Sequence, residues 1–149
     1  MEVAIEISAE ADYPYGAVIV KGGKIVGRSD AVYKEVMPEL YTHSEYRAVQ
    51  DAIRQGYGGV REGGLYGGLE GCTVYTSCQP CMICVGVLLY KGVERIVYAA
   101  TLSDSSDYVV QEIETDTEEL IKMSHCGVRV EKELMRSEAV EVLKNWGKK

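Results

Sequence analysis

The sequence predicts an α/β fold, in which helices pack on both faces of one mixed sheet of five strands. Three observations support this prediction. The chain has 149 residues, the usual length of one domain, so we expect residues 1–149 to form a single domain. Two strand-like segments near the N-terminus are separated by a short glycine turn, which is typical of a hairpin. After them, helix-like and strand-like segments alternate to the end of the chain, as in layered α/β proteins.

The first elements are a helix and the hairpin. Residues 2–11 carry spaced apolar side chains and contain neither Gly nor Pro, which favours a helix. The hairpin strands are 15–20 and 25–29, both rich in Val and Ile, and the turn between them is Lys21-Gly-Gly-Lys24. No period extends over 30–42, which contains a proline, so we expect a loop there.

A second helix and a third strand follow. Residues 43–55 place their apolar side chains on one stripe, which predicts a packed helix. The stretch 56–71 is rich in glycine but lacks the Gly-Lys-Ser/Thr ending of a phosphate-binding loop, so we interpret it as a surface loop. Residues 72–76, with the sequence CTVYT, predict a strand.

The C-terminal half continues the alternation. Pro80 stands directly before an apolar periodic segment, 81–91, which predicts a helix, and 95–99 predicts the next strand. Residues 104–122 are acidic, and we expect them to be turn-like at first and helical from Gln111.

A short strand and a helix end the predicted fold. We expect a strand at 128–131 and a closing helix at 137–146, with Ser137 as its N-terminal cap.

Composition and charge exclude several classes of protein. Lys and Arg number 16 against 23 Asp and Glu, which gives a net charge of −7 and argues against binding to a nucleic-acid backbone. The hydrophobic fraction of 46% excludes a disordered chain, and no apolar run is long enough for a membrane helix. The N-terminal segment is acidic and has no Lys or Arg, so we expect it to be neither a secretory signal nor a transit peptide. We therefore expect a cytoplasmic protein that acts on a small molecule.

The five cysteines indicate metal binding rather than disulfides. Their number is odd, and Cys78, Cys81 and Cys84 follow one another with two residues between each pair. Such spacing is typical of metal ligation or, less specifically, of a redox pair. We expect Cys72 and Cys126, which stand apart, to be buried as small hydrophobic side chains.

Two short patterns combine into a candidate catalytic site. His43 opens one predicted helix, and Cys81 and Cys84 share a face at the start of another. Together they supply three ligands suited to zinc, and a catalytic zinc keeps its fourth position open for water. Such an ion lowers the pKa of water from about 15.7 to about 7. Glu45 lies two residues past His43 and can reach the same cavity as a proton carrier.

These patterns resemble a known family. His43-x-Glu45 followed by Pro80-Cys81-x-x-Cys84 is similar to the signature of the zinc-dependent cytidine and nucleobase deaminases. The strands Tyr13-Pro-Tyr-Gly-Ala-Val-Ile-Val20 and Arg95-Ile-Val-Tyr-Ala99 resemble those of bacterial guanine deaminases and tRNA adenosine deaminases. Residues 107–113 faintly resemble a segment of the guanine deaminases that follows the sheet.

The resemblance implies a fold, a cofactor and residue roles. The fold would be a three-layer α/β/α cytidine-deaminase-like sandwich around one mixed five-stranded sheet, and the protein would form a homodimer. One zinc ion per chain would be held by His43, Cys81 and Cys84, with Glu45 as the catalytic proton carrier. Among substrate contacts, Asp30 falls near a position where relatives have Asn, and Ser44 occupies a position usually held by a small residue.

The implied activity is hydrolytic removal of an amino group from a cyclic amidine, with release of ammonia. We expect a free nucleobase as substrate, with guanine preferred. The alternatives are a cytosine or aminotriazine deaminase, a tRNA adenosine deaminase, and a zinc module without catalytic activity.

Simpler interpretations of single residues remain open at this point. Cys78 could serve as a fourth ligand and make the zinc structural, or the cysteines could form a redox pair. His125 and Cys126 fit an ordinary turn. Asp104 and Asp107 are more simply surface acids than secondary proton carriers. Tyr15 or Tyr108 could line the substrate pocket, although the sequence singles out neither.

Overall fold

The computed structural model describes residues 1–31, 43–58, 67–109 and 116–148. Within these ranges the helices are α1 (Glu2–Glu10), α2 (Ser44–Arg54), α3 (Met82–Tyr90), α4 (Leu102–Ser106), α5 (Thr117–Ser124) and α6 (Arg136–Trp146). The strands are β1 (Ala17–Lys21), β2 (Lys24–Arg28), β3 (Cys72–Cys78), β4 (Arg95–Ala100) and β5 (Arg129–Glu131). None of the helices in the described ranges is long and apolar enough to cross a membrane.

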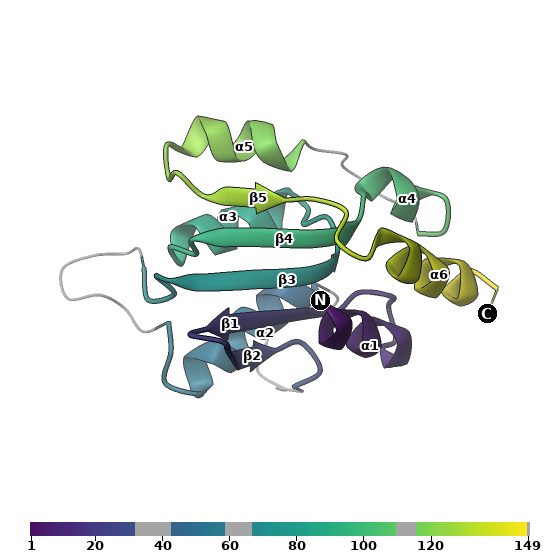
Figure 1. Cartoon of the computed structure of the whole chain (residues 1–149), viewed down its shortest axis with the longest axis horizontal. Coiled ribbons are helices and arrows are strands. Elements are labelled where there is room, and N and C mark those ends of the chain that lie inside the picture. Colours follow the sequence, from purple (N-terminus) through teal and green to yellow (C-terminus); the bar gives the residue numbers. More distant parts are fainter. Residues whose placement is uncertain (32–42, 59–66, 110–115, 149) are drawn as a thin grey trace.

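The strands form one mixed sheet in the order β2-β1-β3-β4-β5, drawn face-on in Figure 1. β1 pairs antiparallel with both β2 and β3, whereas β4 is parallel to β3 and to β5. The central strand β3 is therefore fixed on both sides by backbone ladders. Because β3 and β4 are parallel, their carboxyl ends meet at one edge of the sheet, and the residues that follow them lie close together.

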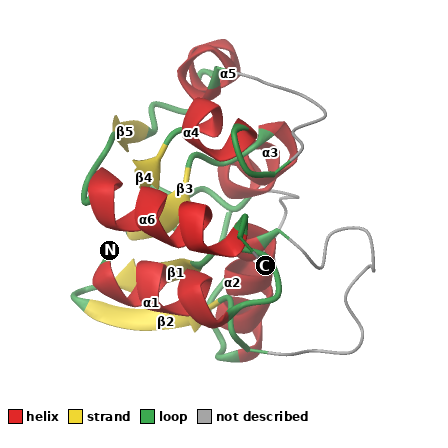
Figure 2. Ribbon diagram, turned by 90° about the vertical axis from the view of Figure 1, so that its right-hand side faces the viewer, coloured by secondary structure: helices red, strands yellow, loops and turns green. Residues whose placement is uncertain are grey.

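Helices cover both faces of the sheet, as the sequence predicts. The larger core cluster joins α2, α3 and α5 to one face through side chains such as Ala48, Leu88 and Ile121. On the other face α1 packs against Val18 and Tyr75, and α6 packs against β4. Helices α1 and α6 lie side by side (Figure 2). The predicted three-layer α/β/α sandwich with five strands is confirmed.

Helix α2 sits unusually close to the sheet because β2 carries a glycine at the contact. A Cβ atom at Gly27 would lie 2.3 Å from the carbonyl oxygen of Ala48 and 2.9 Å from the Cβ of Ala52. Both distances are shorter than nonbonded atoms tolerate, so only glycine fits at this backbone position. Gly27 thereby sets the position of α2, whose first turn carries Glu45.

Some sequence predictions on local structure are wrong, each for an identifiable reason. The stretch from residue 104, predicted to be turn-like at first, begins inside a helix over 102–106, because Thr101 and Asp104 make a reciprocal capping box. Ser137 is not the cap of α6: Met135 occupies that position in a left-handed conformation, and Ser137 lies in the first turn. Cys126 is exposed rather than buried, because it lies in the turn after α5.

Three further predictions can be checked only in part. The predicted loops at 30–42 and 56–71, and the helix start at Gln111, extend over residues 32–42, 59–66 and 110–115, which lie outside the described residues.

Candidate active site

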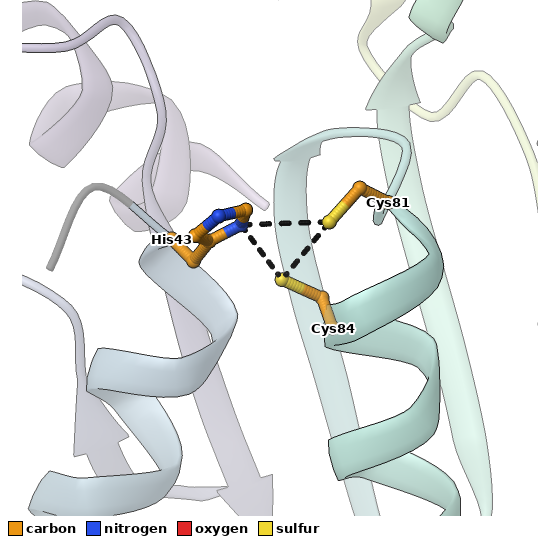
Figure 3. A group of neighbouring side chains, drawn as sticks. All are labelled: His43, Cys81 and Cys84. Atoms are coloured by element: carbon orange, nitrogen blue, oxygen red, sulfur yellow. Dashed lines mark hydrogen bonds between the residues drawn. The ribbon is translucent and has the colours of Figure 1, made fainter. Parts of the chain in front are cut away.

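Two helix starts on the same face of the sheet bring the candidate metal ligands together. His43 is the N-cap of α2, Cys81 is the N-cap of α3, and Cys84 lies in the first turn of α3. The chain reaches α3 directly from the carboxyl end of β3, through Gln79 and Pro80. In Figure 3 the imidazole of His43 and both thiols point toward a common centre between the two helices.

The distances among these three side chains fit a tetrahedral zinc ion. Nδ1 of His43 lies 3.4 Å from Sγ of Cys81 and 3.4 Å from Sγ of Cys84, and the two sulfur atoms are 3.7 Å apart. Ordinary zinc bond lengths at tetrahedral angles separate a nitrogen from a sulfur ligand by about 3.6 Å and two sulfur ligands by about 3.8 Å. The donor set and its spacing therefore suit zinc. Of the described residues, these three alone form such a group.

Electrostatics in this group favour a negatively charged sulfur. The pKa of Cys81 is lowered to about 4, first through its hydrogen bond with Cys84 and then through its hydrogen bond with His43. The same contact with Cys81 raises the pKa of His43. The pKa of Cys84 is raised, first by its hydrogen bond with Cys81 and then by burial, so the group contains one thiolate and one thiol. A thiolate is the form of cysteine that binds a metal ion.

Glu45 lies beside these ligands and is buried. Only 6% of the residue is exposed. Its Oε1 accepts a hydrogen bond of 2.8 Å from Oγ1 of Thr76, and its Oε2 accepts one of 3.2 Å from Oγ of Ser44. Burial raises the pKa of the carboxyl above its ordinary value. A carboxyl group with a pKa closer to neutral pH can both accept and release a proton, which suits it to proton transfer.

A small pocket gives access to this group. It has a volume of about 80 Å³, which is room for more than one water molecule. Its lining combines the candidate ligands with neighbours from four segments: Tyr15, His43, Ser44, Glu45, Cys78, Gln79, Cys81, Cys84 and Leu102. The Tyr15 hydroxyl is hydrogen-bonded to Ser105 at 2.7 Å, which fixes its ring at the pocket wall.

The structure brings five of the six predicted site residues together, and Asp30 is the exception. The Asp30 carboxylate forms an ion pair of 2.8 Å with Arg28 and lines a separate pocket beside α1. That pairing holds the pKa of Asp30 below its usual value. Ser44, in contrast, is buried and lines the pocket beside Glu45.

The other residues considered from sequence have structural surroundings. Cys78 closes β3, and its thiol donates to the carbonyl oxygen of Thr101 at 3.6 Å, away from the three candidate ligands. Burial raises the pKa of that thiol to about 12. Asp104 caps α4 and pairs with Arg136, which lowers its pKa to about 2. Tyr108 packs against the cluster under α6, not in the pocket.

Sequence reasoning missed three contributors to the site: Thr76, Gln79 and Leu102. Leu102 and Gln79 line the pocket, and Gln79 also links two elements, since its Oε1 accepts from the backbone of Leu102 and its Nε2 donates to Thr117. Thr76 contacts Glu45 from the neighbouring strand. Of these three residues, only Gln79 could have been found from the sequence, because it stands directly before the Pro80-Cys81 pattern.

Comparisons with known proteins agree with this geometry. The sequence profile of the MafB19-like deaminases matches residues 1–144. The chain is 29% identical over 121 residues to the guanine deaminase of Bacillus subtilis (strain 168), which covers 76% of this chain and 70% of that enzyme. It is 30% identical over 91 residues to the tRNA-specific adenosine deaminase of Aquifex aeolicus (strain VF5), covering 61% of this chain and 54% of the enzyme.

The fold is also similar to that of solved structures. A protein variant crystallised in complex with 8-azaguanine superimposes with a TM-score of 0.73 at 22% identity, over 99% of this chain and 79% of the other.

Proposed function

The chain belongs to the MafB19-like deaminase family, and we propose that it removes the exocyclic amino group of a free nucleobase by hydrolysis, with guanine as the preferred substrate. One observation carries the proposal: a buried carboxyl, Glu45, lies in the same small pocket as a histidine and two cysteines spaced for zinc. This combination provides activation of water and a proton carrier in a single cavity.

In this proposal His43, Cys81 and Cys84 hold one zinc ion per chain. Bound there, zinc supplies Lewis-acid activation of a water molecule, which makes hydroxide available near neutral pH. The three side chains leave room for that water, because the pocket opens beside them and Cys78 is bonded elsewhere.

Glu45 then moves the protons. Its carboxylate accepts a proton from the attacking water and gives it to a ring nitrogen, while the water oxygen bonds to the amino-bearing carbon. The remaining proton of that water, now on the new hydroxyl group, passes through Glu45 to the amino group. The carbon–nitrogen bond then breaks, and ammonia leaves as the hydroxyl becomes a carbonyl group. The buried position of Glu45 keeps bulk water from competing for these protons.

Two facts favour a free base over tRNA. A guanine deaminase matches 76% of this chain, and a structural neighbour was crystallised in complex with 8-azaguanine. In addition, the net charge of −7 opposes binding to an RNA backbone. Ser44, buried beside Glu45, is the proposed contact to the ring carbonyl through its backbone amide, and Tyr15 is the proposed ring wall.

Deamination of tRNA adenosine is the second candidate, since several relatives are tRNA-specific adenosine deaminases. A filter-binding titration with tRNA separates the two. We expect weak binding at physiological salt, whereas tight, salt-sensitive binding would favour the tRNA substrate.

The main experiment is a screen for ammonia release over guanine, cytosine, adenine, their nucleosides and aminotriazines. Glu45→Gln provides the blank, and Glu119→Gln is its matched control, because Glu119 is an exposed acid in the first turn of α5. We expect release from guanine, loss of at least about a hundredfold in Glu45→Gln and normal activity in the control. Full activity in Glu45→Gln would contradict the proposal.

We further propose a homodimer through the face formed by α2 and α3. This face exposes 42% of Met82, 46% of Ile83 and 55% of Tyr90, which form an apolar surface on α3, the helix that also carries Cys84. A second copy of the chain would bury it. Sedimentation should give a dimer for the wild type and a monomer for Ile83→Glu; a monomeric wild type would contradict this part of the proposal.

A further inference from the structure

We propose that Thr76 is a positioning residue for the reaction: its hydroxyl holds the Glu45 carboxylate in the place that proton transfer requires. This inference rests on the proposed function, because the position of Glu45 matters only if Glu45 carries protons. Oγ1 of Thr76 lies 2.8 Å from Oε1 of Glu45, and the bond is buried and joins residues 31 apart in the chain.

Thr76 is a rigid donor because of its place in the fold. It lies in β3, the central strand, opposite Ala17 of β1 and Tyr98 of β4. Its residue exposure is 1%. Threonine is branched at Cβ, which restricts its side-chain rotation. The hydroxyl is therefore fixed relative to the sheet, and its bond ties the carboxylate of a helical residue to that sheet.

The other contacts of Glu45 cannot replace this bond. Ser44 is its neighbour in the same helical turn, so the bond of 3.2 Å from Ser44 moves with the helix. The Cys84 thiol also interacts with the carboxyl group, but Cys84 is one of the proposed zinc ligands and would bind as a thiolate without a proton to donate. Once zinc is held, Thr76 is thus the one donor to Glu45 that remains on another element, within the part of the chain that the structure describes.

A purely structural role makes a different prediction. The Thr76 hydroxyl also lies 3.0 Å from the carbonyl oxygen of Cys78, and its single hydrogen can serve only one acceptor at a time. If the bond to Cys78 were the important one, loss of the hydroxyl would loosen the turn that leads to Cys81 and reduce zinc binding. If the bond to Glu45 is the important one, turnover falls while zinc is retained.

The test compares Thr76→Val, which removes the hydroxyl at nearly constant volume, with Thr76→Ser, which keeps it. Thr73→Val makes the same change earlier in the same strand and is the matched control. The measurements are zinc content, kcat and KM on the most active base of the ammonia screen. For Thr76→Val we expect one zinc per chain, a KM within about threefold of wild type and a kcat lowered by about 10- to 100-fold. Thr76→Ser should recover most of kcat, and Thr73→Val should match the wild type.

Three results would overturn the inference: a wild-type kcat in Thr76→Val, an equal loss in Thr76→Ser, or a loss of zinc in Thr76→Val. Should Thr76→Val not fold, Thr76→Cys supplies the same comparison, because its thiol is a weak donor of similar size. Glu45→Gln, measured alongside, keeps the failures distinct. An active Glu45→Gln contradicts the proposed function, whereas an inactive Glu45→Gln with a fully active Thr76→Val contradicts only the role of Thr76.

Discussion

Replacement of Gly27 by alanine tests how closely the site depends on the packing of α2. The added Cβ would lie 2.3 Å from the Ala48 carbonyl oxygen, about 1 Å less than an ordinary contact, and also 2.9 Å from the Ala52 Cβ. Neither neighbour is the end of a flexible side chain, so α2 must move away from β2. Overpacking of this kind lowers the free energy of unfolding by about 1–3 kcal/mol. For a chain of this size the melting temperature should fall by roughly 3–10 °C.

The same displacement should reduce activity, because His43 and Glu45 both sit at the start of α2. A shift of about 1 Å in a catalytic group lowers kcat by up to about a hundredfold. The assay combines thermal unfolding of the zinc-loaded protein with ammonia release. Lys24→Ala is the control, since Lys24 is an exposed residue of the same strand β2. A Gly27→Ala variant with wild-type stability and turnover would refute the packing argument.

Three further predictions follow from the ligands, the ion pairs and the free thiols. Cys81→Ser or Cys84→Ser should each abolish stoichiometric zinc and lower the melting temperature, because metal binding is coupled to folding; full zinc in both variants would exclude this ligand set. Asp104 has a pKa lowered to about 2 by Arg136, so its stabilising effect is complete above about pH 4 and is lost as the pH falls toward 2. Between pH 4 and 2, unfolding experiments should therefore show the wild type losing more stability than Asp104→Asn, and equal losses would contradict the ion-pair explanation. Cys126 is the exposed free thiol among the cysteines, so a thiol reagent should modify one site per chain in the zinc-loaded protein, and modification of several sites would contradict the burial and ligation described.

The elements predicted best from sequence are those whose signals are local. The hairpin around Gly22 and Gly23, the apolar stripe of α2 and the proline before α3 each depend on residues within a few positions of one another. The His43 pattern and the Cys81–Cys84 pattern are also local signals, and each lies at the start of a helix. The structure confirms that these three side chains lie close together.

Other features of the site could not be predicted from the sequence. They depend on contacts between distant segments or on which of two nearby partners a side chain binds. The Asp30 carboxylate pairs with Arg28 and does not line the pocket that holds Glu45. No pattern in the sequence distinguishes these two placements. The bond between Thr76 and Glu45 requires the packing of α2 on β3, which only the assembled fold supplies. The helix α4 is different, because its capping residues Thr101 and Asp104 were a readable signal that was overlooked.

The most direct test of the central claim is X-ray absorption spectroscopy at the zinc edge on the purified protein, after metal analysis. We expect about one zinc per chain, bound by two sulfur atoms, one imidazole nitrogen and one further oxygen that exchanges with solvent. A zinc ion enclosed by four protein ligands, with no exchangeable water, would contradict a hydrolytic role for the site.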